Sequence, residues 1–129
     1  MADPKNLEVI MELIVNAGQA KSEAVEAIRA AKNYNFAEAE EKQKLATSAL
    51  NVAHNAQTGL LTQEATGEKA DLSLLMVHGQ DHLMTALTFI DMAKEIIDVY
   101  RELHNLRENN CALPSPVAQT TNTFTFCLL

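Results

Sequence analysis

Three side chains that could do chemistry, His78, Asp81 and His82, lie close together in an otherwise apolar stretch, residues 72–86. Their spacing of i, i+3 and i+4 places them on one side of a helix. Burying a carboxylate and two imidazoles costs several kcal/mol unless these groups are paired, bound to a metal or used in a reaction. The triplet is therefore the candidate functional site of the chain.

Two kinds of chemistry are compatible with this triplet. An imidazole nitrogen is a good nucleophile near neutral pH, and its phosphoramidate is reactive enough to pass a phosphoryl group onward. Alternatively, the order His78-x-x-Asp81-His82 is similar to the H-x-x-E-H pattern of inverted zinc peptidases, which would indicate a metal-dependent hydrolase using His78 and His82. Asp is shorter than Glu, however, and no third protein ligand is evident downstream. A purely structural helical bundle is the third interpretation, and it leaves the triplet unexplained.

The helix that carries the triplet has two apolar faces when it is drawn at about 100° per residue. The face expected to meet the chain's own core holds Leu72, Leu75, Met76, Gly79, Leu83, Ala86, Ile90 and Ile97. The roughly opposite face holds Leu74, His78, Asp81, Thr85, Met92, Ile96, Val99 and Leu103. We expect copies of the same helix to cover this second face around a symmetry axis, which would bring Asp81 near its symmetry mates. Gln80 lies on the polar strip between the faces and is expected to make a neighbouring contact or to face solvent.

The composition describes one compact domain. The chain has 129 residues, 47% of them hydrophobic, with four Gly and three Pro. A net charge of −7 argues against nucleic acid or an anionic membrane as the partner and favours a basic protein.

No signal pattern is evident and no apolar run reaches the roughly 20 residues needed to span a bilayer, so we expect a cytoplasmic protein. Cys111 and Cys127 both lie near the C-terminus, which argues against a disulfide framework or a cysteine metal cluster.

Start and stop signals predict two helices in the first half of the chain. The first begins at Asp3-Pro4 and ends near residue 32, with Lys21 as the one break in a seven-residue apolar rhythm. That rhythm consists of Leu7, Ile10, Ile14, Ala17, Ala24, Ile28 and Ala31. Residues 33–35 form a turn, in which Asn35 with Glu38 resembles a capping box for the second helix. The second helix ends at Thr66-Gly67.

The third helix begins after a cap at Asp71 or Ser73 and continues to about Arg107. Long helices joined by short turns alternate in direction, so the fold class is all-α, an antiparallel three-helix bundle spanning residues 1–107. Residues 108–129 lack a helical period and contain Pro114 and Pro116. We read them as a disordered C-terminal tail with a β-prone end.

Three segments of the sequence together point to a known family: IVNAGQAKSEAVEAIRAAKNYNFAEAEE, AHNAQTGLLTQEATGEKADLSLL and MVHGQDHLMTA. They resemble the lactose/cellobiose-specific IIA component of the bacterial sugar phosphotransferase system. The resemblance covers roughly residues 7–103 and is most specific at VHGQDHLM. It implies a three-helix bundle assembled as a homotrimer with the third helix at the centre. It also implies a phosphohistidine carrier, in which His78 accepts a phosphoryl group from the histidine-containing phosphocarrier protein and passes it to a cysteine of the IIB component. Such a carrier associates only peripherally with the membrane component.

The resemblance also implies that Asp81 meets its symmetry mates on the trimer axis, where a divalent metal such as one Mg²⁺ per trimer holds them. Carboxylates brought within about 4 Å repel by several kcal/mol at an effective dielectric near 20. Magnesium or calcium would remove this repulsion and suits oxygen ligands better than zinc does, while proton sharing is the alternative. Gly79 is a lactose-like feature, because cellobiose-type members often carry Ala there. Lactose, cellobiose and chitobiose are all compatible with the sequence, since sugar recognition belongs to the membrane component.

The remaining histidines differ in what is expected of them. Phosphoryl transfer requires mainly positioning and neutralisation of charge. His82, one turn beyond His78, is expected to donate to the phosphoryl oxygens or to orient the nucleophilic ring. His54 and His104 have no partner pattern, and we expect both to be structural.

Overall fold

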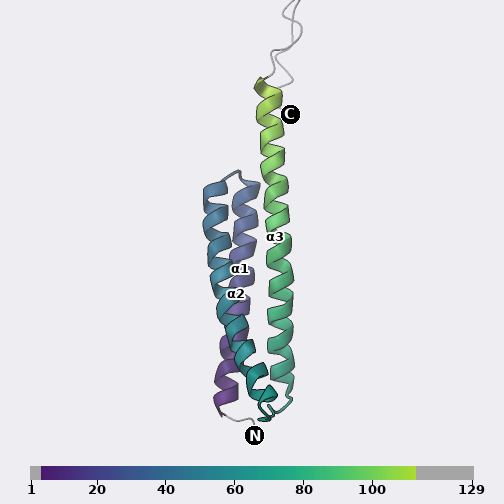
Figure 1. Ribbon diagram of the computed structural model, residues 1–129. Helices are drawn as coiled ribbons and strands as arrows, with labels where there is room; N and C mark the ends of the chain where they lie inside the picture. The colour runs from purple at the N-terminus through teal and green to yellow at the C-terminus, as the bar shows by residue number, and fades with distance from the viewer. Residues whose placement is uncertain (1–3, 113–129) are drawn as a thin grey trace, which may run out of the picture.

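The computed structural model of the chain describes residues 4–112, which form three long α-helices. α1 spans Pro4–Lys32, α2 spans Phe36–Ala65 and α3 spans Leu74–Ala112. α1 and α2 lie side by side in opposite directions, and α3 runs parallel to α1 and extends well past the α1–α2 turn (Figure 1). The predicted all-α three-helix bundle is confirmed. None of the described helices is long and apolar enough to cross a membrane.

Short polar side chains fix where the helices begin. The Asn35 side chain accepts a hydrogen bond from the Glu38 backbone N–H at 3.3 Å, and its amide donates to the Glu38 carboxylate at 2.7 Å. These bonds confirm the capping pair at the start of α2. Of the two caps predicted for α3, the structure uses Ser73, whose hydroxyl accepts from the Met76 N–H at 3.1 Å. The cap predicted at Asp3 lies outside the described residues.

The turn that follows α2 confirms the predicted stop. Gly67 adopts φ +95°, a left-handed backbone conformation that a residue without Cβ reaches at low cost. The Thr66 N–H still donates to the Thr62 carbonyl at 3.1 Å, while the Gly67 N–H donates to the Glu64 carbonyl at 3.1 Å. The chain therefore leaves the helix at this glycine and turns back toward α3.

The core lies between one face of α3 and the small residues of α1 and α2. The buried α3 side chains are Met76, Leu83, Ala86, Ile90, Ala93 and Ile97. Opposite them α1 and α2 present mostly buried alanines, which permits close helix packing. The predicted core face is thus confirmed, except that Leu72 is 86% exposed. Leu72 was wrongly assigned because it precedes the start of α3 and does not follow the helical period.

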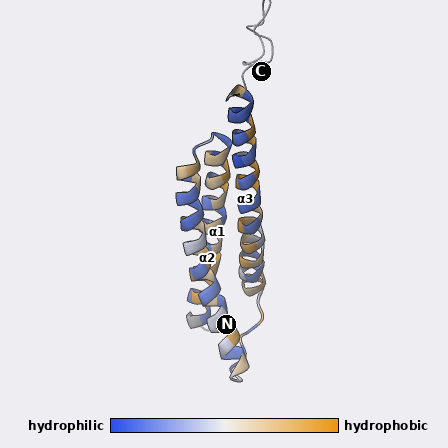
Figure 2. Ribbon diagram, turned by 45° about the horizontal axis from the view of Figure 1, so that its top comes forward, coloured by the Kyte–Doolittle hydropathy of each residue, from blue (hydrophilic) through white to orange (hydrophobic). Residues whose placement is uncertain are grey.

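The second face of α3 is left uncovered by the chain's own helices, as the sequence predicts. Of the large apolar side chains predicted there, Leu74, Met92, Val99 and Leu103 are exposed and Ile96 is partly buried, while Val77, Met84 and Leu106 extend the exposed apolar surface. Hydrophobic colouring continues along α3 beyond the α1–α2 turn in Figure 2. An apolar stripe of this length on one helix is typical of a surface that meets a partner.

α3 is longer than predicted at its C-terminal end. It continues to Ala112 rather than ending near Arg107, because a loss of apolar period is not a loss of helix and the first proline comes only at Pro114. Arg107 also donates to the Tyr34 hydroxyl at 3.2 Å, which ties this part of α3 to the α1–α2 turn. Cys111 consequently lies on the helix. The tail predicted for the remaining residues, 113–129, lies outside the described part of the chain.

Candidate functional site

His78, Asp81 and His82 all lie in the first turns of α3, near the loop that joins it to α2. His78 and Asp81 are exposed, whereas His82 is partly buried. The two imidazole rings meet edge to face, with centroids 4.4 Å apart and an angle of 75° between the ring planes. The predicted placement of the two histidines on one side of the helix is confirmed. An exposed ring supported by a second, partly buried ring is a suitable arrangement for a nucleophile and its neighbour.

The surroundings of His82 lower its pKa and so favour the neutral imidazole. Burial lowers its pKa from the usual 6.5, and the nearby His78 and Lys21 lower it further, while Asp81 acts in the opposite direction. The Nδ1 atom of His82 is buried and has no hydrogen-bond partner among the described residues. A neutral imidazole has one donor and one acceptor nitrogen, so His82 can donate only one N–H to a group bound at the site.

Gly79 brings α3 close to α1 beside the histidines. A Cβ built at Gly79 would lie 3.3 Å from Leu13 Cδ2 and 3.5 Å from side-chain atoms of Ile10 and Ile14. The backbone that carries His78 is therefore packed directly against the core face of α1. This packing holds one side of the site in place, because a close-packed interior resists small displacements.

Gln80 points to the other side of α3, toward α2. Its carbonyl oxygen accepts a hydrogen bond from the Gln57 side-chain amide at 2.5 Å. The expected neighbouring contact is thus confirmed, and the residue is not part of the pair formed by His78 and His82 within one chain.

Asp81 lies on the exposed apolar stripe of α3, as the sequence predicts. Within the residues that the structure describes, no group of three His, Cys, Asp or Glu side chains could hold a metal ion. The described part of one chain therefore does not provide the several oxygen ligands that magnesium takes, and Asp81 by itself would not hold this ion. Among residues 4–112, His78 and His82 likewise have no third protein ligand of the kind that a catalytic zinc site requires.

The other two histidines lie on α2 and near the far end of α3. His54 is exposed on α2, and its structural role stays a prediction. His104 packs at the opposite end of the bundle, with its ring centroid 4.7 Å from that of Tyr34 and 5.7 Å from that of Phe36. The structural role predicted for His104 agrees with this aromatic packing.

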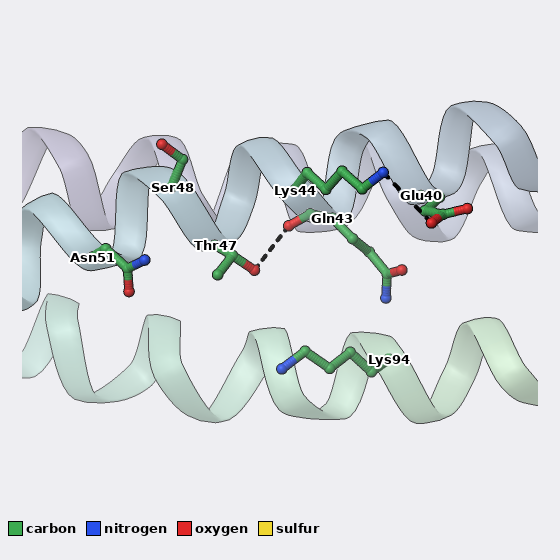
Figure 3. A pocket seen from close by; sticks show the side chains of 7 residues that line it. All are labelled: Glu40, Gln43, Lys44, Thr47, Ser48, Asn51 and Lys94. Carbon is green, nitrogen blue, oxygen red and sulfur yellow. Dashed lines mark hydrogen bonds and ion pairs between the residues drawn. The ribbon is translucent and has the colours of Figure 1, made fainter.

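A polar groove with a volume of about 440 Å³ runs along α2 and α3. Figure 3 shows the side chains that line it, six from α2 and Lys94 from α3. Lys44 pairs there with Glu40 at 3.5 Å, and Lys94 pairs with Asp91 of its own helix at 3.1 Å. None of the three triplet residues lines this groove, so it is separate from the candidate site.

Lys21 is the residue near the site whose importance the sequence did not reveal. It was notable only as the one break in the apolar rhythm of α1. In the structure it is partly buried, and its charge acts on His82. The sequence did contain one signal for Lys21, namely a charged residue on the apolar face of the first helix. The spacing within that helix could not show which residue of α3 lies near it.

Residues 8–101 match the family model described as the PTS system, lactose/cellobiose-specific IIA subunit. The chain belongs to this family. The matched segment contains the whole triplet and Lys21, so the resemblance seen in the sequence is confirmed.

Several relatives within the IIA family are similar over most of their length. The chain is 46% identical over 100 residues to the lichenan-specific phosphotransferase enzyme IIA component of Bacillus subtilis, covering 78% of this chain and 91% of that protein. It is 48% identical over 98 residues to the galactose-specific EIIA component of Lactococcus lactis subsp. cremoris, covering 76% of this chain and 84% of that protein. The sugars in these names differ, so similarity alone does not assign a sugar to this IIA subunit.

Solved structures agree with the fold of this IIA subunit. The PTS cellobiose-specific enzyme IIA from Bacillus anthracis matches with a TM-score of 0.78 and 43% identity, covering 81% of this chain and 95% of that chain. A chain from the solution structures of the IIA(Chitobiose)–HPr complex of the Escherichia coli phosphotransferase system matches with a TM-score of 0.69 and 38% identity, covering 79% of this chain and 99% of that chain. The second of these relatives is thus a IIA component in complex with HPr.

Proposed function

We propose that this IIA subunit is a phosphocarrier of bacterial sugar uptake, which accepts a phosphoryl group on His78 from the histidine-containing phosphocarrier protein HPr and passes it to a cysteine of the IIB component. The observation that carries the proposal is the exposed His78 ring packed edge to face on His82, inside the segment that matches the IIA family. The similarity to a IIA component in complex with HPr supports HPr as the donor.

The two transfers balance without an external reactant. In the first, the N–P bond on the donor histidine breaks while an N–P bond forms at a ring nitrogen of His78. In the second, that N–P bond breaks while an S–P bond forms at the thiolate of the IIB cysteine, which regenerates the unmodified His78 side chain. Because little covalent chemistry is required of the protein, its main tasks are to position the groups and to neutralise charge.

His82 is the residue on α3 best placed to assist. Its ring lies against the ring of His78, and its lowered pKa favours the neutral form, which has one N–H to donate. In this proposal His82 either donates that N–H to the phosphoryl oxygens or holds the His78 ring in the orientation needed for attack. The two roles differ in a measurable way, because only a donor would lose binding of the phosphoryl group in His82→Phe while the ring packing is kept.

We further propose that the carrier works as a homotrimer with α3 at the centre. The support is the apolar stripe of α3, on which Met92 is 55% exposed and Val99 is 58% exposed in a single chain. A rotational assembly about an axis along this stripe would cover it and would bring three copies of Asp81 together. Mg²⁺ bound by these carboxylates would supply the charge that offsets their repulsion.

Transfer from HPr tests the function directly. The protein is incubated with enzyme I, HPr and phosphoenolpyruvate, and we expect an acid-labile, base-stable phosphate on the wild type and on His54→Ala. His54 is a matched control because it is an exposed histidine on another helix. His78→Ala should carry no label. A wild type without label, or a labelled His78→Ala, would refute the assignment.

A further inference from the structure

Lys21 lies on the edge of α1 that faces α3. It shares a seven-residue spacing with Ile14 and Ile28, so the three side chains follow one line along the helix. Ile14 lies 3.5 Å from the position of a Cβ on Gly79, and Ile28 packs against the buried cluster that contains Ile90. Lys21 therefore lies between these two contacts, opposite the part of α3 that follows the triplet.

The direction of the Lys21 side chain carries its charge toward the histidines. Side chains on a helix lean toward its N-terminus. α1 and α3 are parallel, so the N-terminal direction on α1 is also the direction of the triplet on α3 (Figure 1). The ammonium group of Lys21 is therefore directed along α1 toward the level of the triplet.

Lys21 has no ion-pair partner among the described residues, although it is partly buried. Other lysines of the chain do pair with carboxylates, as Lys42 does with Glu23 at 2.9 Å. A lysine stem often covers apolar surface while its ammonium reaches solvent, and this would explain the partial burial alone. It would not explain why a cation interrupts the otherwise apolar line of α1, between Ile14 and Ile28, on the edge that faces α3. The unpaired charge at this place instead indicates an anion that arrives during function.

We propose that Lys21 binds the phosphoryl group carried by His78, with its ammonium donating to the phosphoryl oxygens. The inference rests on the proposed function, because it concerns the phosphorylated state of the same site. A phosphoryl group brings close to two negative charges, and an unpaired ammonium in a partly desolvated place is a suitable partner for them. Lys21 would thereby hold the group in place and stabilise the phosphorylated carrier relative to its donor.

The experiment compares Lys21→Met, Lys21→Arg and the control Lys32→Met. Met nearly keeps the length of the Lys21 side chain and is compatible with the apolar residues Ile14 and Ile28 on the same line of α1. Lys32 is an exposed lysine in the last turn of α1, and replacing it changes the net charge by the same amount. We expect Lys21→Met to lower the equilibrium constant for transfer from phosphorylated HPr about tenfold, the effect of losing one charge-assisted hydrogen bond. Lys21→Arg should recover most of this loss, and Lys32→Met should behave as the wild type.

A second readout separates phosphoryl binding from a packing role. A nearby cation favours the dianion, so the second pKa of the phosphoryl group, followed by ³¹P NMR, should be higher in Lys21→Met than in wild type. Unchanged transfer and an unchanged phosphoryl pKa in Lys21→Met would overturn the inference while the proposed function stands. Absence of any phosphoryl group on the wild type would instead refute the proposed function, and this inference with it.

Discussion

Replacing Gly79 by Ala tests how firmly α1 and α3 are packed beside His78. Ala is favoured over Gly in a helix interior by about 1 kcal/mol. The added methyl would be buried, which contributes about 0.8 kcal/mol. It would also lie 3.3 Å from Leu13 Cδ2, which is too close, and moving that side-chain tip costs about 1 kcal/mol, the low end for overpacking. We therefore expect Gly79→Ala to raise the free energy of unfolding per chain by about 1 kcal/mol.

Urea denaturation at a fixed protein concentration measures this change, and the chain offers a matched control. A Cβ at Gly18, also within a helix, would have no atom within 4 Å apart from its chain neighbours and the backbone of its own helix, so Gly18→Ala reports the helix preference alone. We expect the two variants to be stabilised to a similar degree. Destabilisation of Gly79→Ala together with stabilisation of Gly18→Ala would refute the reasoning, because it would mean that Leu13 cannot move and that this approach of the helices tolerates no added atom.

Three further predictions concern the site and the assembly. Val99→Asp should dissociate the proposed trimer in sedimentation velocity, since an unpaired carboxylate buried at the interface costs about 3–5 kcal/mol. Asp81→Leu should leave the trimer intact or more stable, because it replaces clustered carboxylates by apolar side chains. His82 has its pKa lowered from 6.5, so the unfolded chain binds its proton more tightly than the folded one. The free energy of unfolding should therefore fall as the pH drops below 6.5 toward the folded-state pKa, and His82→Gln should reduce this fall.

Each of these predictions has a result that contradicts it, and two of them have a matched control. Ser48→Asp places the same charge on an exposed position of α2 and should leave the sedimentation unchanged; if Val99→Asp does so too, the α3 stripe is not the interface. Loss of the trimer in Asp81→Leu would contradict simple repulsion and favour an essential metal. His54→Gln removes an exposed imidazole, and an equal reduction of the pH dependence in this variant would contradict the role given to burial at His82.

Much of the fold could be predicted because its signals are local. Pro4, the Asn35 cap and the Thr66-Gly67 stop predicted α1 and α2 correctly, since caps and turns act over a few residues. The pairing of His78 and His82 was predictable for the same reason, because residues four apart on a helix are neighbours. The C-terminal end of α3 could not be predicted in this way, because the apolar period of the sequence ends several residues before a residue that stops a helix.

The sequence by itself determined the helices, their core face and the triplet of potentially reactive side chains, since each depends on the helical period within one segment. Only the tertiary structure decided that His82 is partly buried while His78 is exposed, and that the charge of Lys21 acts on His82. Only it decided that Gln80 turns away to Gln57 on α2. These relations join residues on different helices, and their geometry depends on how far the packed helices are rotated and shifted against one another, which no spacing within a single helix specifies.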